Sequence, residues 1–436
     1  MLSALCATAQ SSTTMQDFFT QVLEGKKPQP IRQKIALKEL PSWRDKVWAA
    51  WRAANVTLSE PKLKECPDTL GPQTASFWQL PDSLEPNARL NYYWGSKGDE
   101  PAQGYPLYIY LHGSGPRDRE WSTGLLLARR WCDAPSVYFI PQIPQEGEWY
   151  RWWQRSKQFA WERLLRQALL NPHIDPRRIY VLGISEGGYG SQRLASFYAD
   201  YWAGAGPMAG GEPLPNAPAE NLRHTPFSFL TGAVDEGFYR NILTRATASA
   251  LDSLRSLYAH ADSSAYIHRI ELIPGKGHHI DYSPTTPWLS QFRRNAPHPA
   301  LTWEDYEMDG RRRNGFGNLE ILQRPDGRTR TRYEMRTEGN NIFLSVDNVK
   351  YTVTEKDPRF GITLRFERTY TKSEGGAVRI YLSEDMVNLK KDVTIYVNGK
   401  KRFSGRLYPN VESMLGSVST FYDPLRIFPA FVDVTY

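Results

Sequence analysis

The chain has 436 residues, of which 40% are hydrophobic and 23% charged, so its composition is that of a globular protein and excludes a disordered or fibrous one. This length is sufficient for two or three domains with sizeable cores. The net charge of +7 results from 54 basic and 47 acidic residues spread along the chain, and without a nucleic-acid-binding motif it indicates solubility rather than nucleic-acid binding.

Residues 1–9 resemble the remnant of an export signal. Residues 7–9 (Ala-Thr-Ala) have the small-x-small pattern that a signal peptidase cleaves, although the apolar stretch is short and no basic residue precedes it. The sequence contains no run of about 18 apolar residues, so no membrane-spanning helix is expected. We therefore expect a secreted or periplasmic protein, with attachment to the outer surface left open. In an oxidising compartment Cys66 and Cys132 could form a disulfide, but their pairing cannot be read from the sequence.

Residues 10–104 are expected to form an N-terminal extension with helical and β segments. Apolar residues recur at helical spacing over residues 15–24 and 43–54, which predicts a helix in each range. The apolar segments FWQL and LNYYWGS follow, and they are separated by Pro, Asp and Asn residues, which favour turns. These two segments therefore predict a pair of strands.

Residues 105–297 alternate between short apolar runs and longer helical segments. The runs are LYIYLHG, SVYFIPQ, RIYVLGIS, FSFLTGAVD and HRIELIPGKGHH. Because enough residues for a crossover helix separate each run from the next, they predict a doubly wound, mostly parallel sheet covered on both faces. Residues 161–170 and 191–197 are expected to form crossover helices, the first before the strand that ends at Ser185 and the second after it. This α/β region is the predicted catalytic core.

Residues 298–436 have a different character. Their apolar segments are short, rich in β-branched and aromatic residues, and parted by Gly, Asn and Asp. Asn398-Gly399 lies between VTIYV and KKRFSG and is a strong signal for a β-hairpin. We therefore expect an all-β, sandwich-like C-terminal accessory domain.

Ser185 is the predicted nucleophile. It lies in the sequence Gly-Ile-Ser-Glu-Gly-Gly (183–188), directly after an apolar run. A serine in a G-x-S-x-G pattern at the end of a strand lies on a strained turn that exposes its hydroxyl and leads at once into a helix. The pattern alone also fits an ordinary strand-to-helix turn, so the assignment depends on whether a base and an acid follow.

Both follow in the order that a hydrolase of this kind requires, namely serine, acid and histidine. Asp235 comes after the run FSFLTG, where a loop beyond a strand can carry the acid, and Glu236 beside it is the alternative. His278 comes after RIELIP and directly follows a glycine, and it is preferred as the base over its neighbour His279. Ser185, Asp235 and His278 therefore form the predicted triad.

Two backbone N–H groups are expected to stabilise the oxyanion of the reaction intermediate. One belongs to Glu186, the residue after the nucleophile. The other belongs to the HGSG sequence that follows LYIYL, with Ser114 as the preferred donor and Gly113 next. A flexible turn is the alternative interpretation of HGSG.

Four aromatic residues follow the run SVYFIPQ and are expected at the edge of the sheet where ligands bind. They are Trp149, Tyr150, Trp152 and Trp153. Trp149, Tyr150 and Trp153 are the predicted walls of a substrate pocket. For Trp152 and Trp153 the start of a helix that packs on the core is an equal alternative.

The motifs HGSG, IDPRRIYVLGISEGGYG, TGAVDEG and GKGHH together resemble the α/β-hydrolase superfamily, nearest its polyhydroxybutyrate-depolymerase, feruloyl-esterase and prolyl-oligopeptidase-like branches. The resemblance covers about residues 105–297 and implies an α/β-hydrolase fold, the triad named above, and neither a metal nor a cofactor. The chain also looks similar to secreted hydrolases of gut Bacteroidetes-type bacteria, many of which act on plant polysaccharide esters. It departs from prolyl oligopeptidases because only 111 residues precede His112, too few for a β-propeller.

These observations predict a carboxylic-ester hydrolase that acts on an acylated carbohydrate, of acetyl or feruloyl type, through an acyl-enzyme. A serine peptidase acting on small peptides is one alternative, and an inactive hydrolase scaffold that binds glycans is another. The expected partner is a small-molecule or polysaccharide-derived ester. The oligomeric state and the role of the C-terminal β domain are left open by the sequence.

Overall fold

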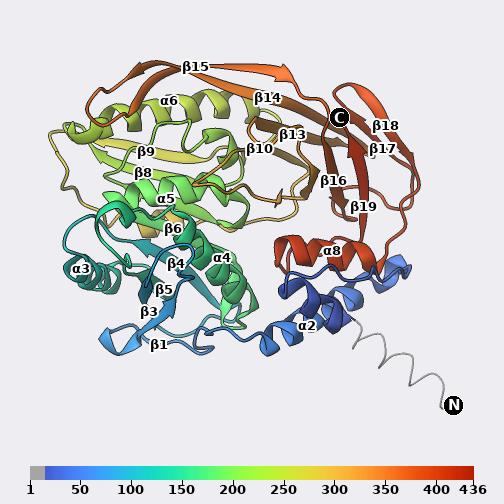
Figure 1. The fold of residues 1–436 in the computed structure, drawn as a ribbon, viewed down its shortest axis with the longest axis horizontal. Helices are drawn as coiled ribbons and strands as arrows, with labels where there is room; N and C mark the ends of the chain where they lie inside the picture. Colours follow the sequence, from blue (N-terminus) through green and yellow to red (C-terminus); the bar gives the residue numbers. More distant parts are fainter. Residues whose placement is uncertain (1–14) are drawn as a thin grey trace.

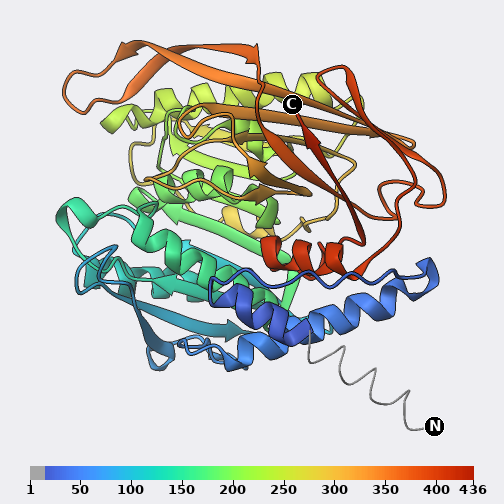
Figure 2. The ribbon, with the colours of Figure 1, turned by 45° about the vertical axis from the view of Figure 1, so that its right-hand side comes forward.

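The computed structural model describes residues 15–436, and the predicted remnant of an export signal at residues 1–9 lies outside the described residues. Three assemblies of elements make up the described chain. A large sheet carries helices on both faces, two further sheets come from C-terminal strands, and N-terminal helices lie against helix α8 (Val411–Phe421), as Figures 1 and 2 show.

The large sheet has nine strands in the order β1-β3-β5-β4-β6-β7-β8-β9, with β2 paired to β3. The strands from β5 to β9 in this order run parallel, whereas β3 runs antiparallel to β5. They are β1 (Asp68–Thr69), β2 (Ala75–Gln79), β3 (Arg89–Lys97), β4 (Tyr105–Leu111), β5 (Ser136–Pro141), β6 (Ile174–Ile184), β7 (Gly204–Met208), β8 (Phe227–Gly232) and β9 (His268–Ile273). This confirms the predicted mostly parallel sheet in an α/β protein.

Helices cover both faces of the sheet, because alternate residues of each strand point to opposite sides. The helices are α3 (Arg117–Arg130), α4 (Arg155–Leu170), α5 (Glu186–Phe197), α6 (Arg240–Tyr258) and α7 (Thr285–Leu289). In β4, Leu107 and Ile109 belong to the core that includes residues of α4, α5 and α6. Tyr108 and Tyr110 belong to the core that includes residues of α3 and α7. The central strand β4 is therefore buried on both sides, which explains its continuous apolar run.

The two predicted crossover helices are present, and both begin earlier than predicted. Helix α4 begins at Arg155 rather than at residue 161, and its buried residues Trp161, Leu164, Leu165 and Ala168 recur at the spacing of one helical face. Helix α5 begins at Glu186 because the turn at Ser185 leads directly into it.

The N-terminal extension is not separate from the large sheet. Strand β3, which corresponds to the predicted segment LNYYWGS, pairs with β5, and β1 and β2 pair with β3. Tyr92, Trp94 and the neighbouring apolar side chains of β3 are buried in the core of the sheet. The sheet therefore begins well before residue 105, which corrects the predicted boundary at residues 104 and 105.

The C-terminal strands form two sheets that enclose a common core. The first sheet has the order β10-β13-β14-β17-β18 with β15 paired to β14, and the second has the order β11-β12-β16-β19. Ile342 and Leu344 from the first sheet pack in one core with Ile380 and Leu382 from the second, as in a sandwich. The strands are β10 (Ala300–Asp305), β11 (Gly315–Phe316), β12 (Leu319–Gln323), β13 (Arg330–Glu338), β14 (Asn341–Lys356), β15 (Thr363–Lys372), β16 (Ala377–Leu382), β17 (Val393–Val397), β18 (Lys400–Gly405) and β19 (Ala430–Thr435).

The predicted hairpin at Asn398-Gly399 joins β17 to β18, and both residues have the positive φ that this tight turn requires. The prediction of an all-β C-terminal region is wrong in one respect, because helix α8 lies within it. Residues 15–23 are helical, and α2 (Leu40–Thr57) contains the predicted helix 43–54. Both N-terminal helices share a core with α8, which explains why α8 is apolar on one side.

Buried ion pairs connect the large sheet to the C-terminal sandwich. Asp200, after α5, pairs with Arg313 and Arg426, and Arg426 also pairs with Asp423, 2.7 Å away. Asp423 in turn pairs with Arg294 at 2.5 Å. Burial alone would raise the pKa of the Asp200 carboxyl, but the two arginines lower it to about 2. The five charges are therefore one network that both parts of the chain share.

Short 3-10 turns complete the described chain: η1 (Leu37–Glu39), η2 (Pro72–Thr74), η3 (Gly147–Trp149), η4 (Ala199–Tyr201), η5 (Ala219–Leu222) and η6 (Gly237–Tyr239). Cys66 and Cys132 are exposed free thiols, so the disulfide that the sequence left open is not formed in this structure. Within residues 15–436, no helix combines the length and the apolar character needed to cross a membrane.

Candidate active site

Ser185 lies on the sharp turn between β6 and α5. Its backbone has φ 58° and ψ −115°, a conformation that non-glycine residues rarely adopt and that costs energy. The turn also brings backbones very close together, since a Cβ atom on Gly187 would lie 1.9 Å from the carbonyl oxygen of Leu111. A Cβ on Gly183 would lie 2.2 Å from the oxygen of Gly187. The glycines of the motif are therefore required by the close approach of the chain, as expected for an exposed nucleophile.

The structure brings the three side chains of the predicted triad together. His278 lies in the loop after β9, and its Nε2 is 3.0 Å from the Oγ of Ser185. Its Nδ1 is 2.8 Å from the Oδ2 of Asp235, which lies in the loop after β8. Because a carboxylate only accepts hydrogen bonds, Nδ1 carries the proton and Nε2 is free to accept the proton of the serine hydroxyl.

The alternative residues for acid and base lie elsewhere. Glu236 is exposed, whereas Asp235 is buried next to the imidazole. His279 is exposed and its ring is 5.8 Å from the ring of His278. The geometry therefore favours Asp235 and His278 over their neighbours.

Arg240 also belongs to the site, although no sequence pattern predicted it. Its Nη1 donates a hydrogen bond to the Oδ1 of Asp235 at 3.1 Å, and Arg240 is itself buried. Both carboxylate oxygens of Asp235 are thus engaged, one by His278 and one by Arg240. This leaves the carboxylate a single orientation, in which it can hold the imidazole.

Two predicted oxyanion donors lie next to Ser185. The N–H of Glu186 is the first of helix α5, so it has no acceptor within the helix. Gly113 lies against the nucleophile, since a Cβ atom placed on it would be 3.4 Å from the Cβ of Ser185. Ser114 lines the same pocket as Ser185. Which of Gly113 and Ser114 donates the second hydrogen bond stays a prediction.

The loop that carries Gly113 is held by a dense set of hydrogen bonds. The hydroxyl of Tyr150 donates to the carbonyl oxygens of Gly113 and Gly115 at 2.7 and 3.1 Å. His112 donates from Nδ1 to the carbonyl of Gly113 and accepts the N–H of Ile143 at its Nε2. Burial lowers the pKa of His112 to about 4, so its imidazole stays neutral. The alternative interpretation of HGSG as a flexible turn is therefore wrong, because these hydrogen bonds fix the loop.

Of the predicted pocket walls, only Trp153 lines the pocket at Ser185. Tyr150 is buried and fixes the Gly113 loop instead, and Trp149 lies outside the pocket with its ring beside Lys157. Trp152 is fully buried and donates to the carbonyl oxygen of His112, so for this residue the alternative of core packing is the correct one.

The pocket has a volume of about 510 Å³ and opens beside Ser185. Its residues come from both the large sheet and the C-terminal sandwich. They are Ser114, Arg151, Trp153, Ser185, Glu186, Tyr189, Arg193, Gly211, Glu212, Pro213, Asn216, Phe238, Arg240, Phe360, Gly361, Ile362 and Thr363. A pocket of this size accommodates a small organic substrate.

The carboxyl group of Glu186 is unusual within this pocket. Burial raises its pKa to about 7, although Arg151 opposes the shift from 3.6 Å away. Its Oε1 is buried and accepts no hydrogen bond from any described residue. By contrast, Glu212 on the same wall is satisfied by Arg193, which binds it through two nitrogens at 2.7 and 3.0 Å. Glu186 is thus less completely paired than Glu212.

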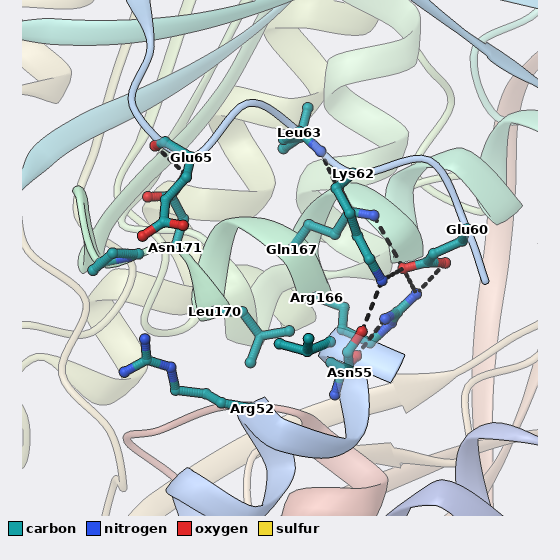
Figure 3. A pocket seen from close by; sticks show the side chains of 12 residues that line it. Arg52, Asn55, Glu60, Lys62, Leu63, Glu65, Arg166, Gln167, Leu170 and Asn171 are labelled. Atoms are coloured by element: carbon teal, nitrogen blue, oxygen red, sulfur yellow. Dashed lines mark hydrogen bonds and ion pairs between the residues drawn. The ribbon is translucent and has the colours of Figure 1, made fainter. Parts of the chain in front are cut away.

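A second cavity, of about 260 Å³, lies between α2, α4 and residues 60–65 and is drawn in Figure 3. It contains no predicted site residue. Three of its charged groups pair with one another, since Arg166 binds Glu60 at 2.7 Å and Lys62 lies 3.7 Å from the same carboxylate. Among residues 15–436, no cluster of three or more His, Cys, Asp or Glu side chains is arranged to hold a metal ion. The candidate active site is therefore the pocket at Ser185.

The sequence matches no protein-family profile and no curated protein. Solved structures that match it are esterases and serine hydrolases at low identity. A thermostable esterase is 20% identical, with a TM-score of 0.38, over 50% of this chain and 63% of that chain. A ferulic acid esterase is 14% identical, with a TM-score of 0.36, over 50% and 97% of the two chains.

A third match is LpqC, a poly(3-hydroxybutyrate) depolymerase from Bordetella parapertussis, which is 16% identical, with a TM-score of 0.34, over 50% of this chain and 87% of that chain. This chain thus spans 63% of the length of the thermostable esterase and most of the length of the other two. Matches of this degree do not assign the chain to a family.

Proposed function

We propose that this protein is a serine hydrolase of the α/β-hydrolase type that cleaves carboxylic esters. The observation that carries the proposal is the hydrogen-bonded chain from Asp235 through His278 to Ser185, on a strained turn between strand and helix. A serine hydroxyl attacks an ester poorly unless a base takes its proton, and the base needs an acid to hold its tautomer. Here Ser185 is the proposed nucleophile, His278 the base and Asp235 the acid.

The chemistry follows from the distances. The Oγ of Ser185 attacks the acyl carbon while Nε2 of His278, 3.0 Å away, takes its proton. Asp235 stabilises the imidazolium through Nδ1, and backbone N–H groups at Glu186 and at Ser114 or Gly113 stabilise the oxyanion. His278 then gives the proton to the leaving alcohol, and an acyl-enzyme forms on Ser185. Water, activated by His278, hydrolyses this intermediate and restores the serine.

The proposal has two further parts, which concern the alcohol of the ester and the export of the protein. The alcohol of the ester is proposed to be a carbohydrate, since charged and aromatic side chains line the pocket together. Export is proposed because of the small-x-small pattern at residues 7–9. Similarity to secreted Bacteroidetes-type hydrolases stays a prediction from the sequence.

Labelling of the purified protein with a fluorophosphonate probe tests the reactive serine. We expect one adduct by intact mass on the wild type and none on Ser185→Ala, together with loss of para-nitrophenyl acetate turnover in the variant. Ser196→Ala is the matched control, because Ser196 lies at the other end of α5 and donates to the carbonyl oxygen of Pro218. A folded wild-type protein that takes up no probe would contradict the proposal. Turnover of amides as fast as matched esters would point to a peptidase instead.

A further inference from the structure

One wall of the pocket at Ser185 comes from the far C-terminal part of the chain. Strands β14 and β15 form a long hairpin that crosses over α6, as both Figure 1 and Figure 2 show. Its tip, residues 357–362, contributes Phe360, Gly361 and Ile362 to the pocket, and Thr363 follows. The C-terminal sandwich therefore reaches the site where the proposed chemistry occurs.

The hairpin tip is held in a defined position next to the loop of the triad acid. Asp357 is buried, and its Oδ1 accepts a hydrogen bond from the hydroxyl of Tyr239 at 2.9 Å. Its Oδ2 accepts the N–H of Phe360, and its carbonyl oxygen accepts the N–H of Gly361 at 3.0 Å. Gly361 has φ 68°, which the turn requires. The tip is thus fixed by its own hydrogen bonds and by a residue four positions after Asp235.

The partner loop is strained at the point of contact. Phe238 and Tyr239 have φ values of 54° and 60°, in the left-handed region that aromatic residues rarely adopt. Such strain persists only where the surroundings determine the conformation, and it is common at ligand-binding sites. Here it turns the ring of Phe238 toward that of Phe360, with the ring centroids 4.7 Å apart.

The two phenylalanines leave much of their surface uncovered. Phe238 is 43% exposed and Phe360 is 48% exposed, and both line the pocket. On the same pocket lie groups of the opposite character, namely the carboxyl of Glu186, whose Oε1 accepts no hydrogen bond from any described residue, and the half-exposed guanidinium of Arg151, 3.6 Å from its Oε2. A ligand that fits must therefore offer an apolar face and several hydrogen-bonding groups at once.

A fatty acyl chain would leave the buried Oε1 of Glu186 without a hydrogen bond, and a small charged ligand would leave the rings exposed to water. A pyranose ring meets both requirements, because its C–H face stacks on aromatic rings while its hydroxyls both donate and accept hydrogen bonds. We propose that Phe360 and Phe238 stack on a sugar ring of the ester substrate, with its hydroxyls bound by Glu186 and Arg151. The inference rests on the proposed function and assigns a substrate-selecting role to the C-terminal hairpin.

The test compares two substrates in each variant. Monoacetylated methyl xyloside carries the sugar and para-nitrophenyl acetate does not, so the ratio of their kcat/KM values measures sugar recognition. We expect Phe360→Ala to lower this ratio by about 10-fold, mainly through a higher KM for the sugar ester, because one stacking partner is lost. Phe360→Tyr keeps the ring and should retain the ratio. Phe77→Ala removes a phenylalanine of equal exposure, 46%, on strand β2 outside the pocket, and should also retain it.

Each result has a defined meaning. A wild-type enzyme that hydrolyses para-nitrophenyl acetate, but whose ratio is the same in Phe360→Ala, would overturn the sugar subsite and leave the proposed hydrolase intact. A wild-type enzyme that hydrolyses the aryl ester but not the sugar acetate would also overturn the sugar subsite and leave the proposed hydrolase intact. Absence of both turnover and fluorophosphonate labelling in the wild type would instead contradict the proposed function itself.

Discussion

Asp235 holds the imidazole of His278 only if its own carboxylate cannot rotate. Arg240 supplies the second hydrogen bond that prevents this rotation, and its guanidinium also lies over the ring of Phe238, 5.1 Å from the centroid. Arg240 is thus a positioning residue, which acts through Asp235 rather than on the substrate's reacting atoms. Arg240 can be substituted while all three triad residues are kept, so its contribution can be measured separately from theirs.

We expect Arg240→Met to lower kcat for an aryl ester by about 10- to 100-fold, the loss that follows when a charged hydrogen bond is removed. Arg240→Lys should recover part of this loss because it restores a cation near Asp235. Arg245→Met, at an exposed position of the same helix, is the control and should leave kcat unchanged. Equal kcat values for Arg240→Met and the wild type would show that Asp235 does not need this partner.

The carboxyl of Glu186 makes the stability of the protein depend on pH. Its pKa rises from an ordinary 4.5 to about 7 on folding, so between these values the folded state binds more protons than the unfolded state. The free energy of unfolding therefore falls as pH rises through this range, by up to about 3 kcal/mol. Stabilisation is complete below about pH 4.5 and lost above about pH 7.

Glu186→Gln should remove this part of the pH dependence, because glutamine does not titrate. Urea unfolding of both proteins at about pH 5 and about pH 8 measures it, and the wild type should lose more stability than the variant between the two. Curves that shift in parallel for the two proteins would show that the carboxyl is not destabilised by burial.

At the scale of elements, the turn between β6 and α5 depends on glycine because three backbones meet there. Gly187→Ala would place a methyl group 1.9 Å from the carbonyl oxygen of Leu111, so β4 and α5 would have to move apart. We expect a loss of about 3 kcal/mol in the free energy of unfolding, measured in urea, together with loss of ester turnover. Gly327→Ala is the control, since nothing lies within 4 Å of its Cβ position. A Gly187→Ala protein as stable as this control would contradict the described turn.

The elements that were predicted correctly have one property in common. The apolar residues that mark each of them lie within one short segment of the sequence. The strands before Ser185 and Asp235 end in buried, mostly apolar runs, and the strand before His278 carries Ile270, Leu272 and Ile273, so the ends that carry the predicted triad could be located. Helix α8 and the pairing of β3 with β5 were missed because each depends on a partner far along the chain. Tyr150 was misread for the same reason, since its side chain points to the Gly113 loop rather than to the pocket.

At the scale of the whole molecule, the network around Asp200 makes the large sheet and the sandwich depend on each other. Asp200→Asn would leave Arg313 and Arg426 buried with one carboxylate fewer, and a buried charge without its partner costs about 3 to 5 kcal/mol. We expect this loss in urea unfolding, in a single transition. Glu384→Gln breaks the surface pair with Arg44 and should cost less than about 1 kcal/mol. Two separate transitions in the wild type would show that the two parts unfold independently.

The lining of the pocket could be predicted only in part, because its residues come from segments that lie far apart along the chain. Trp153 was found because it follows a strand of the large sheet, where ligands bind. Arg240 was not, because no local pattern marks the first residue of α6 as a partner of Asp235. The hairpin tip at Phe360 was not, because it reaches the site from another sheet. Such residues become visible only when the packing of the whole chain is known.

The strands β14 and β15 pair along their length and extend well beyond the sandwich core, while the tip that touches the pocket is only a short turn. The tip belongs to neither core, so its sequence can change provided that Asp357 is kept, which accepts the hydrogen bond from Tyr239. In the proposed function, Phe360 at this tip contributes to the choice of the alcohol, whereas Ser185, Asp235 and His278 lie on other segments of the chain. Exchange of residues 358–362 alone is thus expected to yield variants that keep the proposed triad and accept other alcohols.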